Sequence, residues 1–276
     1  MTVLLALVAA FFYGLSDFLG GVFSRRTSVW AVGLLACAGA AVGSVLIALF
    51  SSGDPSGADF SWALLAGVGS GSGTAFLYRG LAAGRMGVVA PVSAVGAVLV
   101  PLAVGVATGE RPAVVGWLGI VLALPGIWLV SREDSQSPVG GSSGLVDGVL
   151  AGLGFGMLFA ALGQVPDSAG YWPLVGTQLV SIASLALIAV VVGDNPLPKR
   201  SADLGGLLAG LLASLAVLFF LLATSNGLLS IAAVITSLYP AFTVLFAITL
   251  LREQVHRTQS IGLAFCALSV VLVSLA

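Results

Sequence analysis

The stretch SREDSQSPVGGSSG, residues 131–144, divides the chain into two halves of nearly equal length. It is rich in serine, glycine and charged residues, which is the composition of a linker. Five long apolar runs precede it and five follow it. Because five crossings end on the opposite side of a membrane, two similar halves would be inverted relative to each other. We therefore predict an all-α polytopic membrane protein with ten transmembrane helices, arranged as two inverted five-helix repeats.

The composition indicates that most of the chain lies in lipid. Of the 276 residues, 59% are hydrophobic and only 8% are charged, whereas about a quarter are charged in an ordinary soluble domain. The net charge of −1 excludes a basic face for nucleic acid. The two cysteines, Cys37 and Cys266, lie in separate apolar runs, which is neither a disulfide framework nor a metal-binding spacing.

Each apolar run is long enough to cross a bilayer, which requires about 20 residues per helix. The first run lacks a basic segment before it and a cleavage site after it, so we expect a retained span rather than a signal peptide. The first repeat covers residues 1–131, the linker 132–144 and the second repeat 145–276. The predicted spans are 2–22, 30–50, 62–83, 86–107, 113–131, 145–163, 171–192, 204–225, 229–250 and 256–275.

The basic residues predict the orientation in the membrane. Nine of the ten lie on the side reached after odd-numbered spans, and only Arg111 lies on the opposite side. Because lysine and arginine are enriched in cytoplasmic loops, the linker is predicted in the cytoplasm and both termini outside. The nine residues are Arg25, Arg26, Arg79, Arg85, Arg132, Lys199, Arg200, Arg252 and Arg257.

The two halves also align with each other without gaps. At an offset of 143 residues, GERPAVVGWLG (109–119) falls on REQVHRTQSIG (252–262), which pairs Glu110 with Glu253. Each glutamate lies in the turn before the last span of its repeat, and we expect it to cap the helix that follows. Inverted repeats are common in transporters, whose binding sites lie near the membrane midplane where the repeats meet.

The helix count, Gly109–Glu110 and its partner Arg252–Glu253 resemble the drug/metabolite transporter (DMT) superfamily, specifically its EamA-type exporters. The opening YGLSDFLGGVFSRR (13–26) is similar to bacterial members of that group. The resemblance covers essentially the whole chain and implies export of a small metabolite through a central cavity lined by helices 1, 3, 4, 6, 8 and 9. We expect a multi-pass protein of the plasma membrane, such as a bacterial inner membrane. Many relatives keep both termini in the cytoplasm, whereas the arginines here predict the reverse.

The first predicted helix carries a polar stripe. Tyr13, Ser16, Asp17 and Gly20 lie at helical spacing on one face. Such a face should turn away from lipid. Asp17 is a candidate to bind a cationic group of the substrate or to carry a proton.

The ninth predicted helix shows Thr236, Tyr239, Pro240 and Thr243 at the same spacing, and the alignment places Ser93 opposite Thr236. Pro240 frees a backbone carbonyl one turn earlier. The alternative is that these residues only kink the helix and fill gaps between helices. We expect a substrate site formed by Tyr13, Ser16, Asp17, Tyr78, Arg79, Ser93, Thr236 and Tyr239.

Arg79 and Asp17 lie at a similar depth from the predicted cytoplasmic ends of their helices. Buried charges in membranes are usually paired, so we predict an Asp17–Arg79 ion pair that acts as a gate by forming and breaking during alternating access. The alternative is that Arg79 reaches the lipid headgroups, which leaves Asp17 free. In the same helix as Arg79, GVGSGSGT (67–74) contains two GxxxG pairs and predicts close helix packing.

These features favour a secondary transporter that exports a small amphipathic metabolite or drug, such as an amino acid or a related compound. An enzyme would need a nucleophile–base pair, a carboxylate pair or a metal site, and the single histidine, His256, is expected at a helix end. The alternatives are an exchanger or facilitator without proton coupling, and a non-transporting scaffold. We expect a small-molecule substrate, no cofactor, a monomer or homodimer, and leave proton coupling open.

Overall fold

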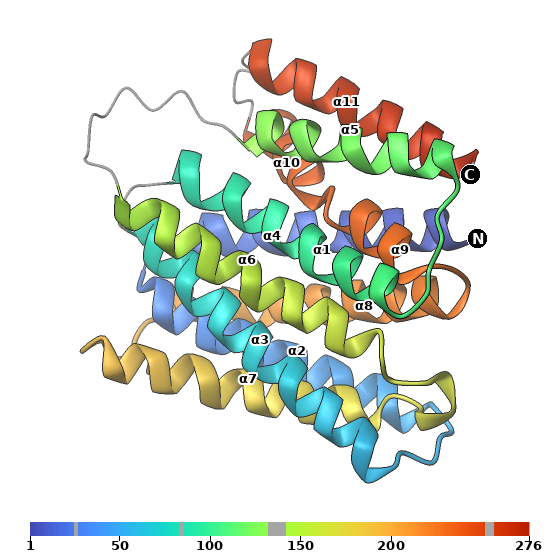
Figure 1. Cartoon of the computed structure of the whole chain (residues 1–276). Coiled ribbons are helices and arrows are strands. Elements are labelled where there is room, and N and C mark those ends of the chain that lie inside the picture. The colour runs from blue at the N-terminus through green and yellow to red at the C-terminus, as the bar shows by residue number, and fades with distance from the viewer. Residues whose placement is uncertain (25–26, 83–85, 132–141, 252–256, 276) are drawn as a thin grey trace.

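The computed structural model describes residues 1–24, 27–82, 86–131, 142–251 and 257–275. The described residues form eleven α-helices and two short 3₁₀ helices, and no strand occurs among them. The helices pack side by side in one bundle (Figure 1). The start of the first helix and the end of the last helix lie on the same side of the bundle, opposite the helix ends that flank residues 132–141 (Figure 1). This arrangement is the one expected for an even number of spans.

The helices follow the predicted order. In the first half they are α1 (Thr2–Ser24), α2 (Val29–Leu49), α3 (Gly57–Ala82), α4 (Met86–Ala107) and α5 (Val114–Ser131). In the second half they are α6 (Ser142–Leu162), η1 (Asp167–Ala169), α7 (Trp172–Val191), η2 (Ser201–Leu204), α8 (Gly205–Ser225), α9 (Leu229–Thr236), α10 (Tyr239–Leu251) and α11 (Arg257–Ser274). Among the described residues, five helices are long and apolar enough to cross a membrane by themselves: α1, α2, α6, α7, and α8 together with η2.

The ninth predicted span is two helices rather than one. α9 ends at Thr236 and α10 begins at Tyr239, with Ser237 and Leu238 in a turn between them. Pro240 explains the position of the break, because proline lacks an amide hydrogen and its ring displaces the carbonyl one turn earlier. The prediction of one continuous helix over 229–250 is therefore wrong at this turn. The partner helix in the first repeat, α4, is continuous.

Most contacts between two helices have an equivalent contact in which each helix is replaced by its counterpart in the other repeat. α3 packs on α6 as α8 packs on α1, and α4 packs on α6 as α9 and α10 pack on α1. In the same way, α2 packs on α8 as α7 packs on α3. α5 contacts α11 and α2 contacts α7, so equivalent helices meet each other. α1 and α6 run in opposite directions (Figure 1), which confirms the two inverted five-helix repeats.

Two glycines confirm the register of the alignment between the repeats. A Cβ on Gly14 of α1 would come 2.8 Å from the Tyr239 carbonyl oxygen of α10. A Cβ on Gly156 of α6 would come 2.8 Å from the Gly96 carbonyl oxygen of α4. The alignment pairs Gly14 with Gly156 at an offset of 142 residues and Gly96 with Tyr239 at an offset of 143. The same close contact is therefore made once in each repeat.

The glycine-rich segment of α3 packs closely, as predicted. A Cβ on Gly67 would come 2.5 Å from the Thr177 carbonyl oxygen of α7, and one on Gly69 would come 2.5 Å from the Gly154 carbonyl oxygen of α6. The two GxxxG pairs thus allow close packing against two different helices, α7 and α6.

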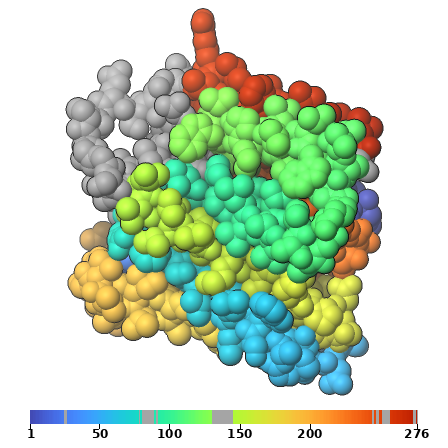
Figure 2. Space-filling model, viewed as in Figure 1, coloured from blue at the N-terminus to red at the C-terminus, as the bar shows by residue number. Residues whose placement is uncertain are grey.

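The outside of the bundle is apolar. Val114, Leu118 and Val121 form an exposed stripe on α5, and Figure 2 shows that the side chains of α4, α5 and α6 close this face over the interior.

Candidate functional site

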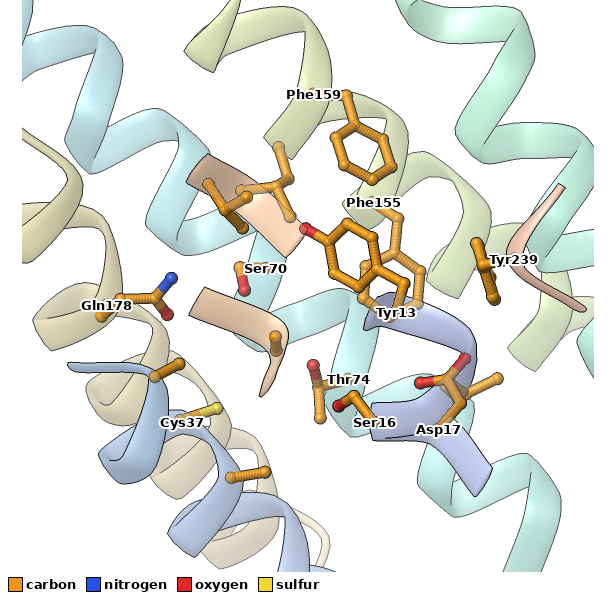
Figure 3. A pocket seen from close by; sticks show the side chains of 16 residues that line it. Tyr13, Ser16, Asp17, Cys37, Ser70, Thr74, Phe155, Phe159, Gln178 and Tyr239 are labelled. Atoms are coloured by element: carbon orange, nitrogen blue, oxygen red, sulfur yellow. The ribbon is translucent and has the colours of Figure 1, made fainter. Parts of the chain in front are cut away.

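A cavity of about 100 Å³ lies in the middle of the bundle, between the two repeats (Figure 3). This space holds several water molecules or a small part of a ligand. The family resemblance implied a lining from helices 1, 3, 4, 6, 8 and 9, but α2 and α7 line the cavity, and none of the α4 side chains that the structure describes does. The lining residues are Tyr13, Ser16, Asp17, Ala36, Cys37, Ala40, Ser70, Thr74, Leu77, Phe155, Leu158, Phe159, Gln178, Ala213, Val217 and Tyr239.

The predicted polar stripe of α1 faces this cavity. Tyr13, Ser16 and Asp17 all line it (Figure 3). The Ser16 hydroxyl donates a 2.8 Å hydrogen bond to the Ala209 carbonyl of α8, which satisfies it within the bundle. The Asp17 side chain is exposed to the cavity space, and it makes no hydrogen bond or ion pair with another described residue. Asp17 is therefore a carboxylate held inside the bundle but free to contact a ligand.

Aromatic rings form part of the cavity wall. The Tyr13 ring lies 5.8 Å from the Phe159 ring, edge to face, and 6.1 Å from the Tyr239 ring. Tyr13 lies one helical turn before Asp17 on the same face of α1, and Tyr239 lines the cavity with them. The Tyr13 hydroxyl oxygen is buried and has no hydrogen-bond partner among the described residues. A buried hydroxyl without a partner is expensive, and in this structure the Tyr13 hydroxyl is enclosed by the bundle although the residue lines the cavity.

The opposite wall is polar and was not predicted from the sequence. Gln178 of α7 and Ser70 of α3 lie across the cavity from Tyr239 (Figure 3). The Ser181 hydroxyl donates a 3.2 Å hydrogen bond to the Ser70 hydroxyl, and it lies 3.3 Å from the Cys37 sulfur of α2. Gln178 was detectable in the sequence, because an uncharged amide in the middle of an apolar span rarely faces lipid.

The remaining predicted site residues lie away from the cavity. Ser93 of α4 is buried and hydrogen-bonds the Tyr239 side chain, so it helps to position a ring that lines the cavity without lining the cavity itself. Thr236 is fully buried at the end of α9, and its hydroxyl has no partner among the described residues. The expectation that Tyr13, Tyr239, Ser93 and Thr236 share one space is therefore correct for the tyrosines and wrong for the other two. Tyr78 lies in α3, but its side chain is outside the described part of the chain.

Arg79 pairs with Asp147, a partner that was not predicted from the sequence. Its Nε donates a 2.9 Å hydrogen bond to Oδ1 of Asp147, and its Nη2 contacts the same oxygen. Asp147 is buried near the start of α6, and the guanidinium also lies 4.8 Å above the Phe76 ring. The predicted Asp17–Arg79 pair is thus wrong in this structure. The reason is topological, because α3 packs along α6 whereas α1 packs mainly on α8.

Glu110 caps a helix of the other repeat. Its carboxylate accepts hydrogen bonds from the backbone amides of Leu229 and Ser230, the latter at 3.0 Å, at the start of α9. The expectation that it caps the following helix, α5, is wrong. The absence of a side chain on Gly105 leaves the space that this carboxylate occupies. Its predicted counterpart, Glu253, lies outside the described residues.

We expect Glu110→Ala to lower the free energy of unfolding by about 1–2 kcal/mol, because two amides of α9 lose their acceptor. Glu110→Gln should cost less, since its amide oxygen still accepts one of these bonds. Thermal unfolding of the purified variants measures both effects, with the exposed neighbour Arg111→Gln as the control. Equal melting temperatures for Glu110→Ala and Arg111→Gln would contradict the capping role.

Comparison with known proteins relates the whole chain to one family. The model of the EamA-like transporter family matches residues 1–132 and 142–275. An uncharacterized transporter of Synechocystis sp. is 27% identical over 183 residues, which cover 58% of this chain. The match spans 54% of that protein's own length, or about half of it. A crystal structure superimposes with a TM-score of 0.73 at 15% identity, covering 99% of this chain and 96% of the other, which shows a shared fold.

Proposed function

The chain belongs to the EamA-like transporter family, and from that premise we propose that it is a secondary transporter exporting a small amphipathic metabolite or drug, such as an amino acid or related compound. It is a multi-pass membrane protein of a transporter family rather than a member of an enzyme family. Within the proposal, the protein lies in the cell membrane with both termini outside, as its basic residues predict.

The observation that supports this proposal best is the cavity between the inverted repeats. It combines a free carboxylate, Asp17, with polar groups such as Gln178 and aromatic walls such as Phe159. Beside it, the chain breaks between α9 and α10, and Tyr239 at the start of α10 lines the cavity. Discontinuous helices at a repeat interface are where secondary transporters commonly bind their substrates.

Alternating access requires contacts between the repeats that hold at one end while the other end opens. Two polar contacts link the repeats at opposite ends of the bundle. Arg79 and Asp147 join α3 to α6 at the end where residues 132–141 connect the repeats. Glu110 joins the α4–α5 connection to the start of α9 at the other end. We propose that these two contacts close the two ends of the transport pathway.

The proposal is tested by flux into and out of proteoliposomes that contain the purified protein. We expect saturable uptake or counterflow of radiolabelled amino acids and related amphipathic compounds, above that of protein-free liposomes. A pH gradient of either sign should change the rate if transport is coupled to protons, and should leave it unchanged for a facilitator or exchanger. No flux with any compound under any gradient would contradict transport and favour a scaffold.

A further inference from the structure

The charge of the cavity narrows the class of ligand. Asp17 is the one charged side chain among the described residues that line it. Arg79, the basic residue predicted to pair with it, is engaged by Asp147 instead. The cavity therefore has a negative group without a positive partner in the described part of its wall.

The shape of the surroundings suits a cation with an apolar body. The rings of Tyr13, Tyr239 and Phe159 form a connected aromatic cluster on the wall of the same cavity as Asp17. Aromatic faces attract ammonium groups, most strongly where water is excluded. Phe155 and Phe159 both line the cavity on the α6 side, next to the Tyr13 ring (Figure 3). A carboxylate near Asp17 would be repelled, and no described lining side chain offers it a positive charge.

We propose that this cavity selects small organic cations, namely monocationic amines with an aromatic or aliphatic body, over zwitterions and anions of the same size. The ammonium group binds the Asp17 carboxylate between the two phenols, and the apolar body lies against Phe155 and Phe159. This inference rests on the proposed function, since it specifies the substrate class of the same site. The expected ligand is then an amine without the carboxylate of an amino acid.

The test compares three ligands with the same phenyl body: phenethylamine, phenylalanine and phenylpropionate. Isothermal titration calorimetry on the purified full chain measures their affinities. We expect phenethylamine to bind about tenfold more tightly than phenylalanine, and phenylpropionate to bind more weakly still. Equal or tighter binding of the zwitterion or the anion, or no binding of the amine, would overturn the proposal.

Variants locate the binding site. Asp17→Asn should weaken phenethylamine binding by about tenfold, whereas Asp17→Glu should retain most of it. Asp194→Asn, in an exposed connection after α7, is the matched control and should bind as the unmodified chain does. Unchanged affinity in Asp17→Asn, with the melting temperature also unchanged, would show that the amine binds elsewhere.

Cys37 gives a second readout that does not depend on transport. The chain has two cysteines, and Cys266 packs against α5 away from the cavity, so Cys266→Ala leaves Cys37 as the single thiol. Phenethylamine should slow alkylation of Cys37 by N-ethylmaleimide, and Asp17→Asn should remove this protection. Binding of the amine without flux in proteoliposomes would reject the transporter and retain the charge preference. Flux of phenylalanine that persists in the Asp17→Asn variant would reject the charge preference and retain the transporter.

Discussion

Replacing Gly14 with valine is expected to lower the free energy of unfolding by about 3 kcal/mol and to abolish transport. A Cβ at this position would come 2.5 Å from Cβ of Phe242, 2.8 Å from the Tyr239 carbonyl oxygen and 3.0 Å from the Thr243 amide nitrogen. Two of these atoms are backbone atoms, which cannot rotate away. The Thr243 hydroxyl also donates a 3.2 Å hydrogen bond to the Gly14 carbonyl, and separating α1 from α10 would remove it.

The effect on transport follows from the position of the contact. The backbone that valine would displace belongs to Tyr239, which lines the cavity directly after the break between α9 and α10. Thermal or denaturant unfolding of the purified variant measures stability, and proteoliposome flux measures activity.

The control lies two helical turns further along the same helix. Gly21 has no atom within 4 Å of the position that a Cβ would take, so Gly21→Val should change stability by less than about 0.5 kcal/mol. Gly156→Val repeats the test in the other half, where a Cβ would come 2.6 Å from Cβ of Val100 and 2.8 Å from the Gly96 carbonyl oxygen. Similar melting temperatures for the Gly14→Val and Gly21→Val variants would contradict the close approach of α1 and α10.

The fold was largely predictable because its determinants are local. Length and apolarity locate the spans, and the repeat follows from the order of charges and glycines along the chain. The polar stripe of α1 was likewise readable, since Tyr13, Ser16 and Asp17 share a helix face whatever packs against it. Pro240 marked the ninth span as irregular. Whether a proline kinks a helix or divides it depends on the neighbouring helices, which are not visible in a local pattern.

The errors concern contacts between helices that are far apart in sequence. An alignment of repeats states which residues are equivalent, but it does not state which helices are neighbours. Arg79 was matched to a carboxylate by depth alone, although Asp147, at the start of α6, lies near the same end of the bundle. Glu110 was assigned to the adjacent helix, although its carboxylate reaches α9 of the other repeat. Both errors arise because packing across the repeat interface decides the partner.

The wall formed by α2 and the small lining residue of α8 were missed for another reason. Ala36, Ala40 and Ala213 line the cavity, yet alanine occurs throughout these apolar helices and carries no distinguishing pattern. Small residues create space rather than contacts. Their role becomes visible only when the larger side chains opposite them, such as Phe155, are placed in three dimensions.

The second large effect is expected for Arg79→Leu, which should lower the free energy of unfolding by about 3 kcal/mol. The Asp147 side chain is only 5% exposed, so removing the guanidinium leaves a buried carboxylate without a counter-charge. Asp147→Leu should cost less, because the Arg79 side chain is 35% exposed and can extend its charge towards the lipid headgroups. Unfolding of both purified variants measures this asymmetry.

The double variant Arg79→Leu/Asp147→Leu separates the contribution of the ion pair to stability from a role in gating. The repeat alignment places Leu222 at the position of Arg79, at an offset of 143, and Leu5 at the position of Asp147, at an offset of 142. The double variant therefore gives each repeat the residue that the other repeat already has at the equivalent position. Since a buried pair replaced by apolar residues is often neutral in stability, the double variant should recover most of what Arg79→Leu loses. A double variant as unstable as Arg79→Leu would show that stranding Asp147 is not the cause.

If the pair closes one end of the pathway, the stable double variant should still transport at an altered rate, because an apolar contact opens without separating charges. Transport at the unmodified rate would confine the pair to a structural role.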